Sequence, residues 1–173
     1  PCWMPVPTLP KAFGLVPVAY EGRPQPLDSL GRNSLRLLSN RDTTTVDGQR
    51  MSAVRWLADM FAQPHKAADY PVIRIDNKEV TSFLGLDDAK KYFSFNQILK
   101  SRQKLQDQFN RLQTINKSDY DTFQRKLAEL GNKLTLYIKL GELQNLYLLP
   151  PAKPGAQWQP LEKGLKETDT STD

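Results

Sequence analysis

Residues 17–40 read PVAYEGRPQPLDSLGRNSLRLLSN, and this stretch holds the densest set of structural signals in the chain. Its first four residues favour an extended segment, and the Pro-Gln-Pro triplet at 24–26 favours a rigid turn after it. A helix is expected from Pro26 to Leu38. Asp28 and Ser29 would lie in its first turn, where their side-chain oxygens can accept hydrogen bonds from unpaired backbone N–H groups. The stretch therefore predicts an extended run, a basic turn and a capped helix.

Residues 94–146 carry the strongest apolar periodicity in the chain and predict an antiparallel helical hairpin. Apolar residues recur at steps of three and four over 95–112, with Arg102 as the exception, and again over 120–137. The short polar connection between the two runs suits a helix–helix turn. Gly131, inside the second run, indicates a kink or a close helix contact. The expected fold is mainly α: several short helices packed with this long hairpin, and at most one or two short strands.

The length of 173 residues suits one domain and is enough to bury a hydrophobic core. We expect a proline-rich arm at 1–16, a single helical domain at 17–161 and a polar, disordered tail at 162–173. No apolar run approaches the roughly 20 residues that a membrane-spanning helix needs. The single cysteine, Cys2, excludes an intramolecular disulfide, and the sequence has no Cys-x-x-Cys-His haem attachment site.

The net charge of +5 is concentrated on the predicted hairpin. Residues 94–146 contain nine Lys or Arg against five Asp or Glu, so they account for four of the five net positive charges. An ordinary solvated helical surface is the favoured interpretation of this charge. The alternative is a soluble adaptor whose basic helical hairpin binds a partner helix or nucleic acid. The sequence lacks a nucleic-acid-binding motif, so a nucleic acid partner is not expected.

The residue types needed for catalysis are sparse. His65 is the single histidine, so triad chemistry or a zinc site would depend on it and on Cys2 or carboxylates. Because His65 follows a proline at a predicted helix end, surface exposure or capping is the favoured role. Transient haem ligation is the weaker alternative. The glycines form no phosphate-binding loop. We therefore expect no catalytic residues, no metal site and no enzyme within this chain.

The pattern Glu-Gly-Arg-x-x-Pro-Leu-Asp-Ser-Leu-x-Arg-Asn at 21–33 resembles the start of the extracytoplasmic region of Ccs/Res-type (system II) cytochrome c biogenesis proteins. Those are multi-pass membrane proteins that move haem across a bilayer and help attach it to apocytochrome c. The resemblance covers roughly residues 17–161. Further segments continue it in the same order: Trp-Leu-Ala-Asp at 56–59, Tyr-Pro-Val-Ile-Arg-Ile-Asp at 70–76, Lys-Tyr-Phe-Ser-Phe at 91–95 and Trp-Gln-Pro-Leu at 158–161.

This resemblance implies a soluble, non-catalytic piece of a membrane protein on the extracytoplasmic or periplasmic side of a bacterial membrane. Its partners would be apocytochrome c or other cytochrome assembly components, and its contact with the membrane would run through segments outside this sequence. No cofactor is expected within the chain, although the full-length protein could handle haem.

Polar and aromatic side chains that could contact such a partner occur along the same segments. Arg suits bidentate recognition of a carboxylate, either a haem propionate or an acidic segment. Local roles in fixing the turn, or in a helical ion pair between Asp28 and Arg32, are the favoured alternative. For the aromatic residues, ordinary core packing is the favoured alternative. The partner-binding candidates are Arg23, Asp28, Arg32, Tyr20, Trp56 and Trp158.

Overall fold

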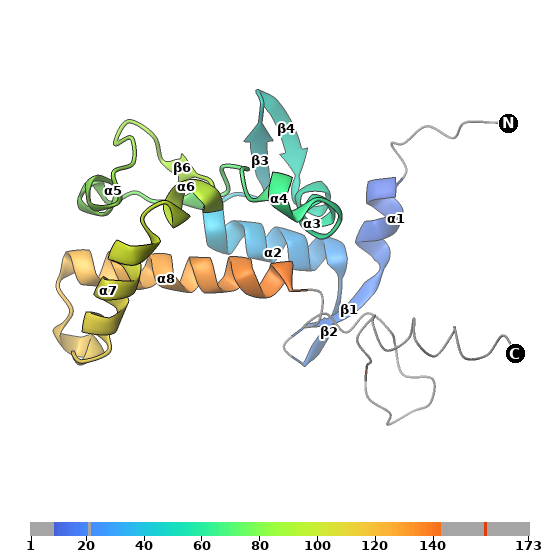
Figure 1. Ribbon diagram of the computed structural model, residues 1–173. Coiled ribbons are helices and arrows are strands. Elements are labelled where there is room, and N and C mark those ends of the chain that lie inside the picture. Colours follow the sequence, from blue (N-terminus) through green and yellow to red (C-terminus); the bar gives the residue numbers. More distant parts are fainter. Residues whose placement is uncertain (1–8, 21, 143–157, 159–173) are drawn as a thin grey trace, which may run out of the picture.

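A computed structural model describes residues 9–20, 22–142 and 158 of the chain. Of the described residues, 59% are helical and 15% lie in strands, and the strands form three small antiparallel two-stranded sheets. The predicted mainly α fold with at most one or two strands is therefore wrong, and the fold is mixed. Helices α2 and α8 lie side by side at its centre, with the remaining elements around them (Figure 1).

The elements follow one another along the chain without a long gap between residues 9 and 141. In order they are α1 (Leu9–Leu15), β1 (Pro17–Tyr20), β2 (Arg23–Pro26), α2 (Leu27–Ser39), β3 (Thr43–Val46), β4 (Gln49–Ser52), α3 (Ala53–Ala62), α4 (Pro64–Ala67), β5 (Ile73–Arg74), α5 (Lys78–Leu84), β6 (Tyr92–Phe93), α6 (Phe95–Leu99), α7 (Arg102–Leu112), the 3-10 turn η2 (Lys117–Asp119) and α8 (Thr122–Gly141).

Helix α2 forms where the sequence predicts it and supplies much of the core. Its leucines at 27, 30, 35 and 38 are all buried, as their helical spacing predicts. The helix packs closely against α3 through Gly31, where an added Cβ would lie 3.0 Å from the carbonyl oxygen of Ala53. It ends at Asn40, whose left-handed backbone (φ 58°) lets its N–H donate to the carbonyl of Arg36.

Two β-hairpins of equal length stand at the two ends of α2. Strands β1 and β2 pair around Gly22, and β3 and β4 pair around the Asp47-Gly48 turn, with positive φ at all three residues. Two consecutive positive φ angles at 47–48 are typical of a type I′ hairpin turn. The triplet Pro24-Gln25-Pro26, predicted to be a turn, instead lies within strand β2. The third pair, β5 with β6, joins only two residues from each strand.

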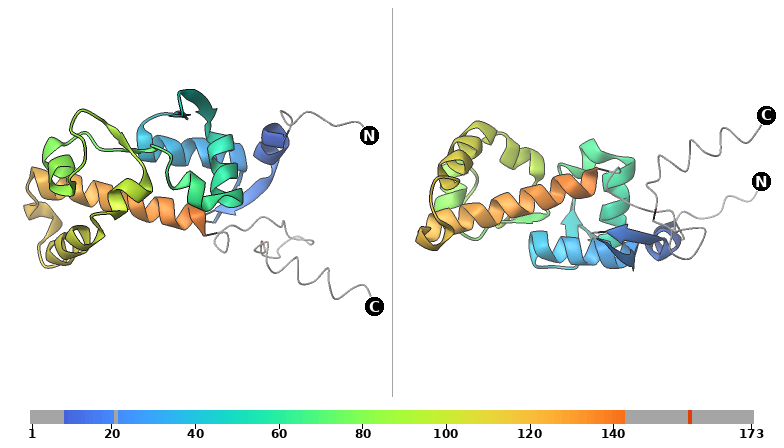
Figure 2. Two further views of the ribbon diagram at one scale, coloured as in Figure 1. Left: turned by 45° about the horizontal axis from the view of Figure 1, so that its top comes forward. Right: turned by 90° about the horizontal axis from the view of Figure 1, so that it is seen from below.

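The predicted helical hairpin at 94–146 is correct in its apolar periodicity and wrong in its geometry. Ile98, Leu105 and Leu112 are buried as expected, but the first helix is broken after Leu99 into α6 and α7. The Ser101 hydroxyl at this break donates to the carbonyl of Leu84 (2.7 Å). Helix α7 then crosses α8 steeply instead of running along it (Figure 2). Residues 143–146 of the predicted hairpin lie outside the described residues.

Gly131 marks the point where α7 meets α8, so the prediction of a close helix contact is confirmed. A Cβ at this position would lie 3.0 Å from Cε1 of Phe109. The second helix of the pair begins with a capping box, in which Asp121 accepts from the N–H of Gln124 and the Gln124 side chain accepts from the N–H of Asp121.

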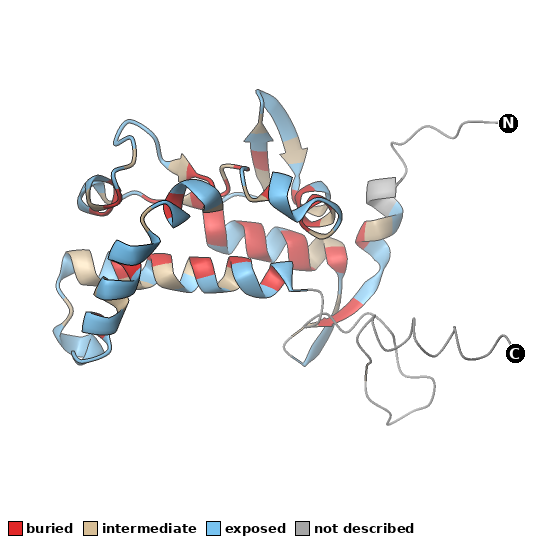
Figure 3. Cartoon of the chain, viewed as in Figure 1, coloured by how far each residue is buried: buried red, intermediate tan, exposed pale blue. Residues whose placement is uncertain are grey.

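The predicted N-terminal arm, residues 1–16, contains helix α1. Its Phe13 ring makes an edge-to-face contact with Phe61 of α3, with 6.0 Å between the ring centroids. Of the 26 buried apolar residues in the described part of the chain, 13 belong to α2, α3 or α8 (Figure 3). No helix among the described residues is long and apolar enough to cross a membrane. Residues 1–8 of the arm and the predicted tail at 162–173 lie outside the described residues.

Candidate functional site

Five of the thirteen residues at 21–33 line one surface cavity of about 640 Å³. We call this cavity the motif pocket. The β1–β2 hairpin brings Arg23 to its rim, because the chain reverses at Gly22 and returns along β2 into α2. The residues that line it are Tyr20, Arg23, Pro24, Gln25, Leu30, Asn33, Ser34, Leu37 and Leu136.

The motif pocket combines an apolar floor with a polar rim. Leu30 is buried beneath it, Leu37 is 63% exposed, and α8 contributes the half-buried Leu136. Arg23 and Asn33 are exposed at the rim, where they offer hydrogen-bond donors. Such an arrangement can hold an apolar side chain while a guanidinium meets a neighbouring carboxylate.

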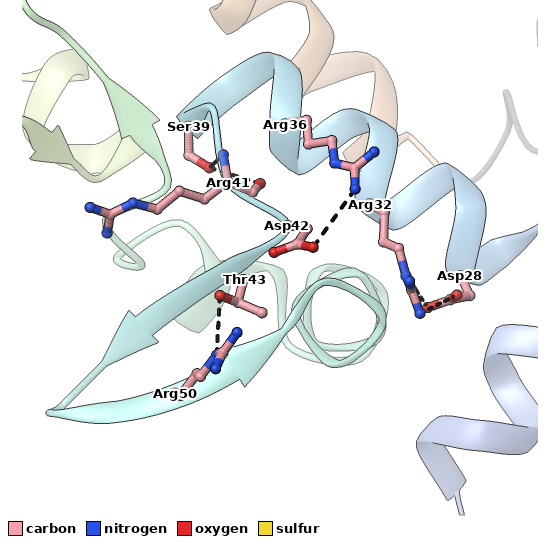
Figure 4. A network of polar contacts seen from close by, with 8 residues as sticks. All are labelled: Asp28, Arg32, Arg36, Ser39, Arg41, Asp42, Thr43 and Arg50. Carbon is pink, nitrogen blue, oxygen red and sulfur yellow. Dashed lines mark hydrogen bonds and ion pairs between the residues drawn. The ribbon is translucent and has the colours of Figure 1, made fainter.

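The second arginine of the pattern is engaged elsewhere. Arg32 forms a two-pronged contact with Asp28 one helical turn away, with Nη2 2.9 Å from Oδ2 and Nε 3.2 Å from Oδ1 (Figure 4). Neither residue lines the motif pocket. The favoured local role of Asp28 and Arg32, a helical ion pair, is therefore confirmed, and Arg23 is the pattern's arginine at the pocket rim.

The other aromatic and histidine candidates do not gather at this pocket. Trp56 is fully buried in the core, so it does not offer a surface to a partner, and the core-packing alternative holds for it. Trp158 is half-buried. His65 is exposed on α4, which agrees with the favoured surface role. No group of three or more His, Cys, Asp or Glu among the described residues could hold a metal ion.

A second cavity, of about 470 Å³, lies between β3 and β6 and was not predicted from the sequence. Arg41 lies over the ring of Tyr92 there, with 4.4 Å between the guanidinium carbon and the ring centroid. The turn signal Asp47-Gly48 could have revealed the adjoining hairpin. The pairing of Arg41 with Tyr92 had no such signal, because fifty residues of chain separate the two.

A buried polar network anchors α3 to the segment that precedes β5. The Tyr70 hydroxyl donates to Oδ2 of Asp59 (3.0 Å), and Nε of Arg55 donates to Oδ1 of the same carboxylate (3.0 Å). Burial, followed by the hydrogen bond to Asp59, raises the pKa of Tyr70 to about 12. A carboxylate satisfied on both oxygens in this way acts as a structural anchor.

A half-buried lysine joins α8 to the same region. Nζ of Lys133 donates to the carbonyl of Arg74 (2.7 Å), and burial lowers its pKa. This contact fixes α8 against β5.

No protein-family model matches the chain, and no curated protein matches it either. The resemblance of residues 17–161 to cytochrome c biogenesis proteins therefore stays a prediction.

Proposed function

We propose that this chain is a non-catalytic interaction domain from the extracytoplasmic part of a membrane protein that assembles cytochrome c. The proposal rests on how the residues of the 21–33 pattern are divided between the buried core and one surface pocket. The leucines of the pattern build α2, while its polar residues Arg23 and Asn33 line one pocket together. A pattern that served only to start a helix would not need these polar side chains on a shared surface.

The chemistry of the motif pocket suits a segment of a protein partner. An exposed arginine beside the apolar Leu37 and Leu136 matches a segment with a carboxylate next to an apolar side chain. A segment of this kind in apocytochrome c is the binding partner that we propose. In this role the domain receives or orients the apoprotein, and haem handling belongs to other parts of the full-length protein.

The two arginines of the pattern provide a matched test. Haem-free cytochrome c is titrated into the full chain, and binding is followed by isothermal calorimetry. Arg23→Gln is expected to weaken binding several-fold, since it removes one charged hydrogen-bond donor at the rim. Arg32→Gln removes the same charge from α2, nine residues further along the chain, but leaves the pocket lining intact, so binding should stay within about a factor of two.

Equal effects of the two substitutions, or no binding of the apoprotein at all, would contradict the proposal. The proposal also predicts membrane-spanning segments in the gene product outside residues 1–173, which the sequence of the complete gene would reveal.

A further inference from the structure

Strand β3 has one edge that pairs with β4 and one edge that no other strand of the described residues pairs with. In an antiparallel hairpin closed by a two-residue turn, the pairs alternate between hydrogen-bonded and non-hydrogen-bonded. The pair Val46–Gln49 closes the turn, so the N–H and C=O groups of Thr43 and Thr45 point away from β4. These four backbone groups form a short free edge.

In the hairpin at the other end of α2, the strand that is joined to α2 has its outer edge blocked. In the β1–β2 register the residues of β2 that point away from β1 are Pro24 and Pro26. Proline has no N–H group, so this edge cannot donate to an added strand. The free edge of β3 is therefore not a general property of the hairpins in this fold.

A basic cavity adjoins the free edge of β3. This cavity, which we call the β3 groove, has a volume of about 470 Å³ and lies between β3 and the β6 strand. The cationic and aromatic residues that line it are Arg41, Lys90, Lys91 and Tyr92. Figure 4 shows the Arg41 side chain pointing away from Asp42 and from the α2 ion pairs.

Arg41 is positioned without a carboxylate partner among the described residues. Its guanidinium lies over the Tyr92 ring, and its backbone is fixed by Ser39, whose hydroxyl accepts from the Arg41 N–H (3.2 Å) and donates to the carbonyl of Leu35 (2.7 Å). A guanidinium held by stacking keeps its N–H groups available for an anion.

The remaining charges leave the β3 groove positive. Lys90 has Asp87 at 3.5 Å, a long exposed pair that contributes little. Asp69 is the acidic residue among those that line the groove, and its carboxylate accepts from the Asn96 side chain (2.7 Å). Three basic side chains therefore face one carboxylate that is already engaged.

We propose that the β3 groove binds an extended acidic peptide by strand addition. The peptide pairs with the outward N–H and C=O groups of Thr43 and Thr45, and its alternate side chains place carboxylates near Arg41 and Lys91. Strand addition accounts for the free edge and the charge together, whereas a phosphate ion would use the charge alone. The proposal does not depend on the cytochrome c assignment, because it concerns a different surface.

The probe is an eight-residue peptide of alternating Glu and Val carrying a fluorophore, titrated with the full chain by fluorescence anisotropy at low salt. Thr45→Pro removes one outward N–H at a position that does not pair with β4, and should weaken binding about tenfold or more. Arg41→Gln with Lys91→Gln tests the charge and should also weaken it about tenfold. Arg125→Gln with Lys139→Gln removes one arginine and one lysine from exposed positions of α8 and should change binding by less than about twofold.

Circular dichroism and thermal unfolding of each variant establish that it is folded. If a folded Thr45→Pro protein binds the peptide with unchanged affinity, the groove recognises charge alone, and strand addition is overturned. Displacement of the peptide from that variant by inorganic phosphate would lead to the same conclusion. Equal binding of a Lys–Val peptide would overturn the acidic preference. Absence of binding to the Glu–Val peptide at millimolar protein would overturn the proposal.

Discussion

The two hairpins that flank α2 have the same length but present different groups to a partner. In β1–β2 the outward positions of β2 are Pro24 and Pro26, and side chains such as Arg23 line the motif pocket. In β3–β4 the outward positions of β3 are Thr43 and Thr45, whose backbone groups are available. Pro24 and Pro26 therefore protect the β2 edge, so recognition along β2 uses side chains, whereas β3 can also use its backbone.

Helix α2 connects the two hairpins, and Gly31→Val should disturb its packing against α3. The valine Cβ would lie 3.0 Å from the Ala53 carbonyl oxygen, so the α2–α3 contact must open. We expect a loss of about 2 kcal/mol in the free energy of unfolding, measured by urea denaturation. Asn33→Ala, on the exposed side of α2, is the control and should cost far less. A loss as small as the control's would show that the α2–α3 contact adapts freely.

A substitution in the turn of one hairpin should destabilise that hairpin and leave the other one protected. Gly48→Val forces a branched residue into a left-handed backbone (φ 77°) and should lower the free energy of unfolding by about 1–2 kcal/mol. Amide hydrogen exchange should quicken in β3–β4 while the β1–β2 amides keep their protection. Gly22→Val (φ 76°) should give the reverse pattern. Loss of protection in both hairpins from either substitution would mean that they fold as one unit.

The prolines on the outer edge of β2 should also stabilise the fold, because they reduce the conformational entropy of the unfolded chain. Pro24→Thr restores backbone freedom to the unfolded state and should reduce the free energy of unfolding by about 0.5–1 kcal/mol. Urea denaturation measures this, with Thr45→Ser on the other hairpin as a near-neutral reference. An increase in stability would indicate that Pro24 is strained in β2.

The smallest expected effect is on the pH dependence of stability, through the hydrogen bond from Tyr70 to Asp59. Burial raises the pKa of Tyr70 from 10.0 to about 12 in the folded protein. The stabilising contribution of its neutral hydroxyl is therefore complete below pH 10 and is lost as the pH rises toward 12. Tyr70→Phe should remove this part of the alkaline decline in stability. A difference absorbance titration between the two proteins measures the pKa, and a midpoint near 10 would contradict the assigned burial.

Some of this architecture could be read from residue patterns and some could not. The leucines of α2 and the apolar steps of α8 follow helical spacing, so these helices were predictable from the sequence. Strand β3 was missed because Thr43 to Thr45 lack apolar alternation, although Asp47-Gly48 is a hairpin signal. The break at Ser101 depends on its bond to Leu84, a tertiary contact that no local pattern encodes.

In the candidate site, too, some features could be predicted from the sequence and others could not. Arg23 was a predictable candidate because arginine in a polar turn suits carboxylate recognition. The floor of its pocket was not, since Leu136 comes from a helix far along the chain. Trp56 lies on the buried side of α3, and a lone tryptophan carries no sign of whether it faces the core or a partner.

The most direct test of two distinct recognition surfaces is nuclear magnetic resonance of the full, nitrogen-15-labelled chain with each probe in turn. Haem-free cytochrome c should shift the backbone amides of Arg23, Gln25 and Asn33 and leave Thr43 and Thr45 unchanged. The Glu–Val peptide should do the opposite and slow amide exchange at Thr43 and Thr45. Shifts at one common set of residues for both probes, or at neither surface, would contradict the presence of two distinct recognition surfaces.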